Sequence, residues 1–121
     1  MNELFRLDGD HLVLLGGRSR SNGMHHFPRS DVCPYTGEDD IDPVELSRTG
    51  RLWLWTAVNS APPGYQGPVP YGFGVVELDG VGLRVVGRLT EADPSVLREG
   101  QPMQLIADRF DDIVTWAFAP A

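Results

Sequence analysis

The fold of this 121-residue chain is indicated by the stretch YGFGVVELDGVGLRVVGRLT, residues 71–90. Two apolar runs lie on either side of Gly80-Val81-Gly82. Strand-forming runs that surround a glycine-rich turn predict a β-hairpin. Fourteen glycines and ten prolines divide the rest of the chain into short pieces, which also favours short strands over long helices.

Another strand is predicted before this hairpin. PVELSRTGRLWLWTAVNS, residues 43–60, contains a strand-like alternation. Side chains alternate between the two faces of a strand, so Trp53 and Trp55 are expected on one face and Leu52 and Leu54 on the other. One of these two apolar sets should remain outside the core. Of all features in the sequence, this one points most directly to a protein interface.

Two more strands, PMQLIADRF and DIVTWAFA, are predicted around the turn residues Asp111-Asp112. A single helical turn should precede them, because Asp93 can cap it, Pro94 suits its first position and Gly100 can end it. Five strands from residue 43 onward, with a short helix between the third and the fourth, predict a mainly β protein with an OB-fold barrel.

The first 42 residues are expected to form a smaller N-terminal part. FRLDGDHLVLLGG, residues 5–17, predicts a hairpin around Asp8-Gly9. Residues 18–42 are polar and rich in turn formers, so they must either pack against something else or move. The expected organisation is a hairpin and ribbon over residues 1–42 and the barrel over residues 43–121, together forming one compact unit.

Two short segments have the spacing of a zinc ribbon without its ligands. A four-thiolate ribbon needs Cys-x-x-Cys twice. In RSRSNG, residues 18–23, and VCPYTG, residues 32–37, the four corresponding positions hold one thiol, one amide and two hydroxyls. They are Ser19, Asn22, Cys33 and Thr36. Of these four residues, only Cys33 can bind zinc strongly. We therefore expect no structural zinc and no other cofactor.

Composition narrows the expected partners and location. The net charge is −7 and every basic residue is arginine, which weighs against binding a phosphate backbone and so against nucleic acid. No apolar run approaches the roughly 18 residues of a membrane span. A single cysteine cannot form an internal disulfide, so a cytoplasmic location without membrane association is expected.

The order of these pieces resembles a known family. GRLWLWTAV, a PPGY loop, PYGFGVVELDG, LRVVGRL and LREGQPM follow one another as in the zinc-ribbon and OB-fold family called domain of unknown function 35. The resemblance extends from about Phe5 to Pro120. It implies a small non-catalytic partner of thiolases and thiolase-like lipid-transfer proteins in acyl-CoA metabolism, including steroid side-chain degradation. Some members associate with hydratase domains that act on enoyl-CoA.

The leading hypothesis is therefore an accessory subunit that stabilises a thiolase or thiolase-like aldolase acting on acyl-CoA thioesters, in a hetero-oligomer. The alternatives are a single-stranded nucleic-acid-binding module and an enzyme or enzyme component, such as a hydratase or esterase, acting on acyl-CoA. The tryptophans Trp53, Trp55 and Trp116 could stack bases, but core packing and interface contacts explain them equally well. No catalytic constellation is recognisable.

Several residues are candidates for contacts with CoA or the partner. Arginine suits CoA phosphates, and Arg18, Arg20 and Arg51 lie near the ribbon and the expected barrel mouth. The proline-rich loop 61–70 carries a stiff tip with an aromatic residue, formed by Pro63, Gly64 and Tyr65. This loop covers a pantetheine arm, contacts the partner or only connects two strands.

Three other sites have simple interpretations. Cys33 is a nucleophile or, as we favour, a leftover structural thiol. His25 and His26 are expected to lie in an exposed loop, since adjacent histidines in a strand point to opposite faces and cannot share one metal ion. The acidic run at 38–40 is expected to form a solvated turn.

Overall fold

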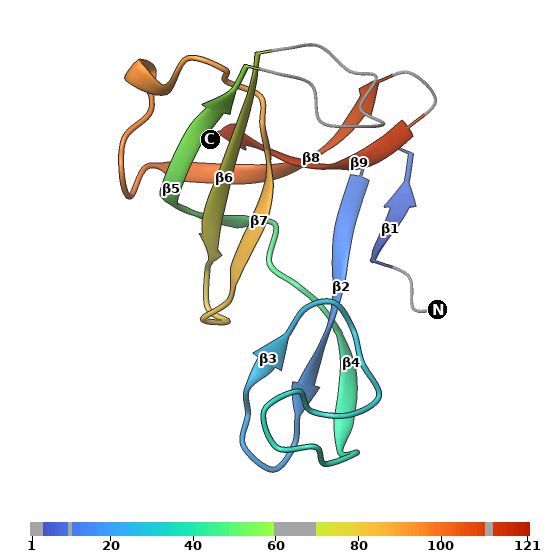
Figure 1. The fold of residues 1–121 in the computed structure, drawn as a ribbon. Helices are drawn as coiled ribbons and strands as arrows, with labels where there is room; N and C mark the ends of the chain where they lie inside the picture. Colours follow the sequence, from blue (N-terminus) through green and yellow to red (C-terminus); the bar gives the residue numbers. More distant parts are fainter. Residues whose placement is uncertain (1–3, 10, 60–69, 111–112) are drawn as a thin grey trace.

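The computed structural model describes residues 4–9, 11–59, 70–110 and 113–121. Five strands close into a barrel in the order β5-β6-β7-β9-β8 (Figure 1). This arrangement confirms the predicted mainly β fold with an OB-type barrel. The barrel strands are β5 (Thr49–Val58), β6 (Tyr71–Leu78), β7 (Arg84–Leu89), β8 (Pro102–Phe110) and β9 (Ile113–Pro120).

Two short contacts close the barrel. Strands β7 and β9 pair in parallel at Arg88↔Ala117 and Leu89↔Phe118. Strands β5 and β8 pair antiparallel over Thr49–Arg51. The inward-facing side chains are aliphatic or aromatic, and their burial supplies most of the stabilisation of such a fold. The fully buried ones include Leu52, Val76, Leu78, Met103, Leu105 and Phe118.

The N-terminal part forms its own sheet, in which β3 and β4 lie below the barrel and β1 lies beside it (Figure 1). Its strands are β1 (Phe5–Asp8), β2 (His11–Ser19), β3 (His25–His26) and β4 (Ile41–Glu45), and β2 pairs with each of the other three. The predicted hairpin is present, with Gly9 at a φ of 65° between β1 and β2. Strand β4 crosses the expected boundary between residues 42 and 43.

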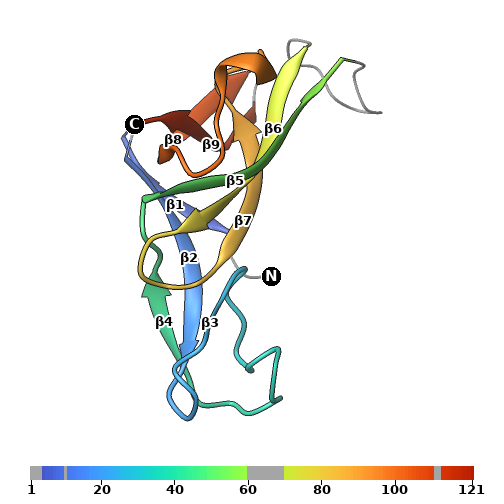
Figure 2. The same cartoon turned by 90° about the vertical axis from the view of Figure 1, so that its left-hand side faces the viewer.

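Strand β2 connects the two parts, since it runs from the barrel into the lower sheet (Figure 2). Leu12, Leu14 and Leu46 belong to the same buried cluster as the barrel residues. Arg48 follows β4 and bridges the parts directly. Its Nε donates to the Leu12 carbonyl at 3.0 Å and its Nη2 to the Leu105 carbonyl at 3.1 Å. The two parts therefore share one core.

Trp116 on β9 completes this joint. Its indole Nε1 donates to the Val86 carbonyl at 3.0 Å. The edges of Phe5 and Phe27 contact its ring, with centroid separations of 6.3 and 5.7 Å. Edge-to-face contacts of this kind add to the free energy that apolar burial provides. Trp116 therefore serves the packing of the N-terminal part against the barrel.

A 3-10 helix (Pro94–Val96) lies between the third and fourth barrel strands, as predicted. Asp93 caps it, since its side chain accepts from the Ser95 amide at 3.0 Å. The predicted end at Gly100 is wrong, because the helix ends at Val96 and Leu97 is its C-cap. Gly100 instead has a φ of 80° in the following turn, a conformation that glycine adopts at little cost.

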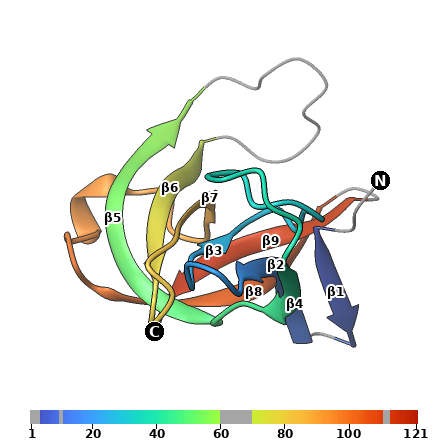
Figure 3. The ribbon, with the colours of Figure 1, turned by 90° about the horizontal axis from the view of Figure 1, so that it is seen from below.

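A register shift in β5 contradicts the predicted alternation. Leu52 pairs with Val76 and Leu54 with Val75, so the residue between them has no partner on β6. Such a β-bulge sends two consecutive side chains to the same face. Trp53 and Leu54 are both exposed, whereas Trp55 packs against the core. Strands β5 and β6 lie side by side around this bulge (Figure 3).

Candidate functional site

The two predicted halves of the ribbon form matching turns. The Gly23 amide donates to the Ser19 carbonyl and the Gly37 amide to the Cys33 carbonyl, each at 2.8 Å. Both glycines have positive φ, 73° and 78°. The two turns thus have the same hydrogen bond and a glycine of positive φ at the same position. We call Ser19, Asn22, Cys33 and Thr36 the knuckle positions.

Cys33 is buried among polar groups. Asn22 Nδ2 lies 3.8 Å from its sulfur, and Asn22 Oδ1 accepts from the Met24 amide at 2.8 Å, which orients the side-chain amide. The hydrogen bond from the Thr36 side chain lowers the pKa of the Cys33 thiol to about 7. Backbone amides of Tyr35 and Thr36 and the Asn22 amide act in the same direction, against the effect of burial. Hydrogen bonding therefore stabilises the thiolate.

This donor set does not fit a tetrahedral zinc. Zinc prefers thiolates and imidazoles, whereas the knuckle positions combine one thiol with two hydroxyls and an amide whose N–H points at the sulfur. Within the described residues, no group of three or more histidine, cysteine or acidic side chains is placed to hold a metal ion. The expected absence of zinc in the purified protein stays a prediction.

Asp40 connects the first knuckle to the segment before β4. Its carboxylate accepts from the Ser19 hydroxyl at 3.1 Å and from the Ser21 amide at 2.6 Å. The Ser21 side chain is the main cause that lowers the pKa of Asp40, and the Ser21 amide and the Ser19 hydroxyl add to it. Glu38 and Asp39 of the acidic run are exposed as expected, whereas Asp40 is half-buried and has these hydrogen bonds, which the composition of the run did not indicate.

The histidine pair does not lie in an exposed loop as expected. Both residues form β3, and His26 is only 3% exposed. Its Nε2 accepts from the Ser30 amide at 3.2 Å, and its Nδ1 has no hydrogen-bond partner among the described residues. The ring lies against Gly17, where any side chain would overlap it. Burial, Arg18 and His26 lower the pKa of the half-buried His25.

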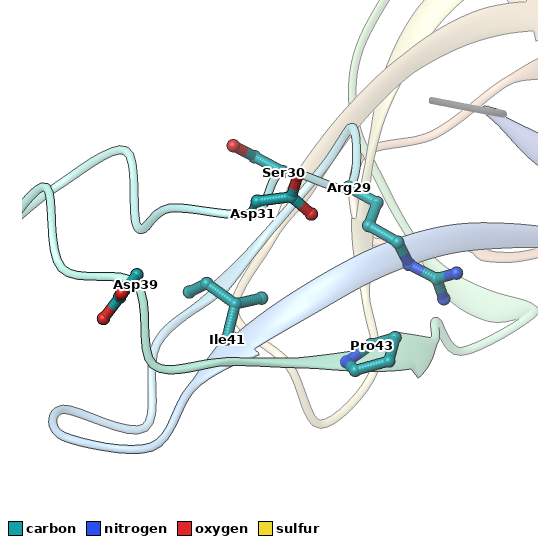
Figure 4. A pocket seen from close by; sticks show the side chains of 6 residues that line it. All are labelled: Arg29, Ser30, Asp31, Asp39, Ile41 and Pro43. Atoms are coloured by element: carbon teal, nitrogen blue, oxygen red, sulfur yellow. The ribbon is translucent and has the colours of Figure 1, made fainter. Parts of the chain in front are cut away.

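A surface pocket of about 530 Å³ lies beside these turns (Figure 4). Arg29 forms one wall and donates to the Gly16 carbonyl at 2.8 Å and to the Val44 carbonyl at 3.0 Å, which fixes its loop to β2 and β4. Asp31 and Asp39 also line the pocket. Two carboxylates against one arginine do not favour a phosphate group.

The predicted arginine candidates belong to two different sheets. Arg18 and Arg20 lie at the end of β2 and just after it, and Arg20 pairs with Asp42 at 2.8 Å. Arg51 lies on β5 and donates to the Gly100 carbonyl at 3.2 Å. The loop-tip candidates Pro63, Gly64 and Tyr65 lie outside the described residues.

Only one of the three tryptophans faces outward from the barrel. Trp55 donates from Nε1 to the Pro94 carbonyl at 3.0 Å, and Trp116 lies in the joint with the N-terminal part. Trp53 is exposed, and the guanidinium of Arg84 lies 3.7 Å from its ring centre. Such a cation–π pair orders both side chains at the surface.

Trp53 belongs to an apolar surface on the outside of β5, β6 and β7. The register aligns Leu54 with Val75 and Val75 with Val86 across the three strands. Phe73 lies on the same face two residues before Val75. A hollow of about 310 Å³, lined mainly by apolar atoms, lies next to Leu54 and Phe73. We call this surface the outer barrel face; its apolar residues are Trp53, Leu54, Phe73, Val75 and Val86.

Sequence reasoning predicted a leftover apolar set but placed its members incorrectly. Phe73, Val75 and Val86 were missed, although the alternation of the hairpin carries the signal. In YGFGV, residues 71–75, the small residues Gly72 and Gly74 face inward and the larger ones outward. Asp40 was missed because its partners lie about twenty residues earlier in the chain.

Comparisons with known proteins agree with this fold. Residues 43–107 match the family model described as the C-terminal OB-fold domain of ChsH2. The chain therefore belongs to the DUF35 OB-fold family. It is 31% identical over 93 residues to a DUF35 domain-containing scaffold protein of Pyrococcus furiosus, covering 77% of this chain and 67% of that protein. A scaffold protein of the same description from Methanocaldococcus jannaschii is 23% identical over 111 residues, covering 87% and 78%.

Two further relatives of the chain are named for enzymes. The benzoylsuccinyl-CoA thiolase subunit BbsA of Thauera aromatica is 31% identical over 88 residues, which cover 73% of this chain and 59% of BbsA. The solved structure named Ltp2-ChsH2(DUF35) aldolase contains a chain that matches with a TM-score of 0.71 and 27% identity, covering 89% of this chain and 84% of that chain. No helix among the described residues is long and apolar enough to cross a membrane.

Proposed function

We propose that this chain is a non-catalytic subunit that binds and stabilises a thiolase or thiolase-like aldolase acting on acyl-CoA thioesters. The observation that carries the proposal is the structural match over 89% of the chain to the Ltp2-ChsH2(DUF35) aldolase. The similarity to a thiolase subunit and to two scaffold proteins points in the same direction. The ribbon that precedes the barrel is, in this proposal, a zinc ribbon that has lost its ligands.

The described side chains favour an accessory role over independent catalysis. Cys33 is buried, and the groups that hydrogen-bond to it are an amide, a hydroxyl and backbone N–H groups rather than a general base. A nucleophilic thiol needs access to substrate and a base within reach. The buried His26 contacts the Ser30 amide and not the thiol. The partner would therefore supply the chemistry.

Contacts with the substrate's CoA moiety are a finer part of the proposal. Arg18, Arg20 and Arg51 remain the candidates for its phosphates, and the loop tip at Pro63, Gly64 and Tyr65 remains the candidate for its pantetheine arm. Steroid-derived side chains are among the acyl groups to be tested.

The test begins with the thiolase-like proteins of the source organism, each purified and mixed with this chain. Sedimentation velocity should detect a hetero-oligomer with one of them. That enzyme should turn over a panel of acyl-CoA thioesters, including steroid-derived ones, faster or for longer when the chain is present. The isolated chain should leave the same panel unchanged. Unaltered stability and turnover of every thiolase-like protein, or turnover by the isolated chain, would refute the proposal.

A further inference from the structure

The outer barrel face has the composition of a protein interface. The exposed fractions are 55% for Leu54, 47% for Val86 and 38% for Trp53 and Phe73. Contiguous apolar patches on a protein surface mark interaction sites more often than isolated apolar residues do. The strand register makes this patch contiguous, because Leu54, Val75 and Val86 occupy one row across three neighbouring strands.

The bulge in β5 enlarges this patch. Regular alternation would direct one of the neighbours Trp53 and Leu54 inward, but the register shift leaves both exposed. Bulges often re-aim a side chain at a functional surface. The hollow of about 310 Å³ beside Leu54 and Phe73 adds a concave element that one apolar side chain of another protein can fill. Tryptophan and arginine, which meet here at Trp53 and Arg84, dominate the binding energy of many interfaces.

Charge identifies the kind of partner. The charged residues of β5, β6 and β7 are three arginines, Arg51, Arg84 and Arg88, and one acid, Glu77. Asp108 on β8 pairs with Arg88 at 2.8 Å. Arg51, Glu77 and Arg84 form one row across the three strands, and Glu77 pairs with Arg84 at 3.7 Å. This end of the face thus keeps an excess of one arginine, in a chain whose net charge is −7. A matching surface is apolar at its centre and acidic where it meets Arg51 and Arg84.

Charge argues against a second copy of this chain on the outer barrel face, and side-chain composition argues against nucleic acid. A second copy would place the same arginines against each other and bring together two chains of charge −7. Single-stranded nucleic acid needs several stacking aromatic side chains along a positive groove. Here the outer barrel face has two aromatic side chains, Trp53 and Phe73, and its row of Leu54, Val75 and Val86 cannot stack on bases.

We propose that the outer barrel face is the surface on which the catalytic subunit docks, and that the docking surface of that subunit is apolar with an acidic rim. This inference rests on the proposed function, since it names the part of the chain that binds the thiolase-like protein.

The test compares two valines of nearly equal exposure. Val86 on the outer barrel face is 47% exposed, and Val32 in the N-terminal part is 45% exposed. Val86→Glu should weaken binding of the thiolase-like protein at least 10-fold in isothermal titration calorimetry, because it places a charge in the apolar centre opposite an acidic rim. Val32→Glu should change affinity less than 2-fold. A melting temperature within a few degrees of that of wild type shows that a variant is folded. If Val86→Glu is not folded, Leu54→Gln is measured in its place.

A second pair of variants tests the rim. Arg84→Glu should lower the association rate at low salt several-fold, and Arg98→Glu, which makes the same charge change outside the three strands, should not. Equal binding by wild type and by both Val86→Glu and Leu54→Gln overturns the inference while the proposed function survives. Failure of every thiolase-like protein to bind wild type defeats both. A dimer of this chain, or a bound labelled oligonucleotide, that Val86→Glu abolishes would also overturn the inference.

Discussion

Arg48 offers a direct test of how the N-terminal sheet is held on the barrel. The substitution Arg48→Met keeps a long aliphatic side chain and removes both charged donors. The hydrogen bonds that disappear join Arg48 to the carbonyl of Leu12 on β2 and to that of Leu105 on β8. These two residues are 0% and 1% exposed, so water cannot readily replace the lost donors.

The expected loss follows from these two contacts. A hydrogen bond from a charged donor contributes about 1.5–3 kcal/mol to stability. Arg48 is partly exposed, so the lower value applies to each bond and the expected loss is about 3 kcal/mol. For a domain of this size, each kcal/mol lowers the melting temperature by about 4 °C. Arg48→Met should therefore melt about 12 °C below wild type.

The measurement is urea unfolding of Arg48→Met, wild type and Arg98→Met, followed by tryptophan fluorescence and by circular dichroism. Arg98 is exposed, so its substitution controls for the loss of one positive charge. A loss below about 1 kcal/mol for Arg48→Met, or one equal to that of Arg98→Met, would refute the idea that Arg48 joins the two parts.

Four further outcomes are expected. Folding lowers the pKa of Asp40, so the contribution of its carboxylate to folding stability is complete above about pH 4 and is lost as the pH falls through the pKa of the folded state. Asp40→Asn should therefore be less stable than wild type at pH 7, and its stability should not show this acid dependence. The pKa of Cys33 is about 7 in the folded chain and about 8.5 when unfolded, so stability should rise from pH 7 to pH 9, and Cys33→Ser should abolish the rise. Gly72→Ala should cost about 2 kcal/mol or more in chemical unfolding, because the added Cβ would overlap the Glu91 carbonyl oxygen. Cysteines at the other three knuckle positions should bind one equivalent of zinc by metal analysis and raise the melting temperature, whereas wild type should bind none; the substitutions are Ser19→Cys, Asn22→Cys and Thr36→Cys.

Each of these outcomes has its own control. Asp39→Asn, beside Asp40 in the exposed turn, should leave the acid dependence intact, and equal profiles for both variants would contradict the role given to Asp40. If the rise in stability above pH 7 persists in Cys33→Ser, another titratable group causes it and the prediction for Cys33 is wrong. Thr56→Ala on the outward face should be nearly neutral beside Gly72→Ala. One equivalent of zinc in wild type would contradict the account of the knuckle positions.

The predictable part of the fold was the part with regular alternation. In the hairpin of β6 and β7, glycine or buried aliphatic residues alternate with outward residues, so the pattern indicates both the strands and their faces. In β5 the sequence LWLW is apolar at every position and is compatible with either face inward. The bulge that places Trp53 outside is decided by pairing with β6, which the sequence of β5 does not contain.

The two turns at residues 18–23 and 32–37 were predictable as backbone shapes, but their side-chain contacts were not. The spacing of its turns and their glycines indicates two knuckles, because a glycine with positive φ ends each of them. The hydrogen bonds of Asp40 and the burial of His26 depend on residues that lie far from them in the sequence. Asp40 meets Ser19 and Ser21 across the sheet, and His26 is buried because Gly17 leaves space for its ring. From the neighbouring sequence alone, both side chains were therefore expected to be exposed to solvent.

The stability of the N-terminal part without a metal ion has a physical explanation in its contacts with the barrel. A structural zinc site contributes folding free energy outright, so a free-standing ribbon without metal would unfold. Here β2 carries Leu12 and Leu14 into the barrel core, and Arg48 and Trp116 tie the two parts together. The barrel thus stabilises the N-terminal part, and Asp40 adds hydrogen bonds to the turn at residues 19–23. We therefore expect the N-terminal part to stay folded without a metal ion, because it does not have to fold alone.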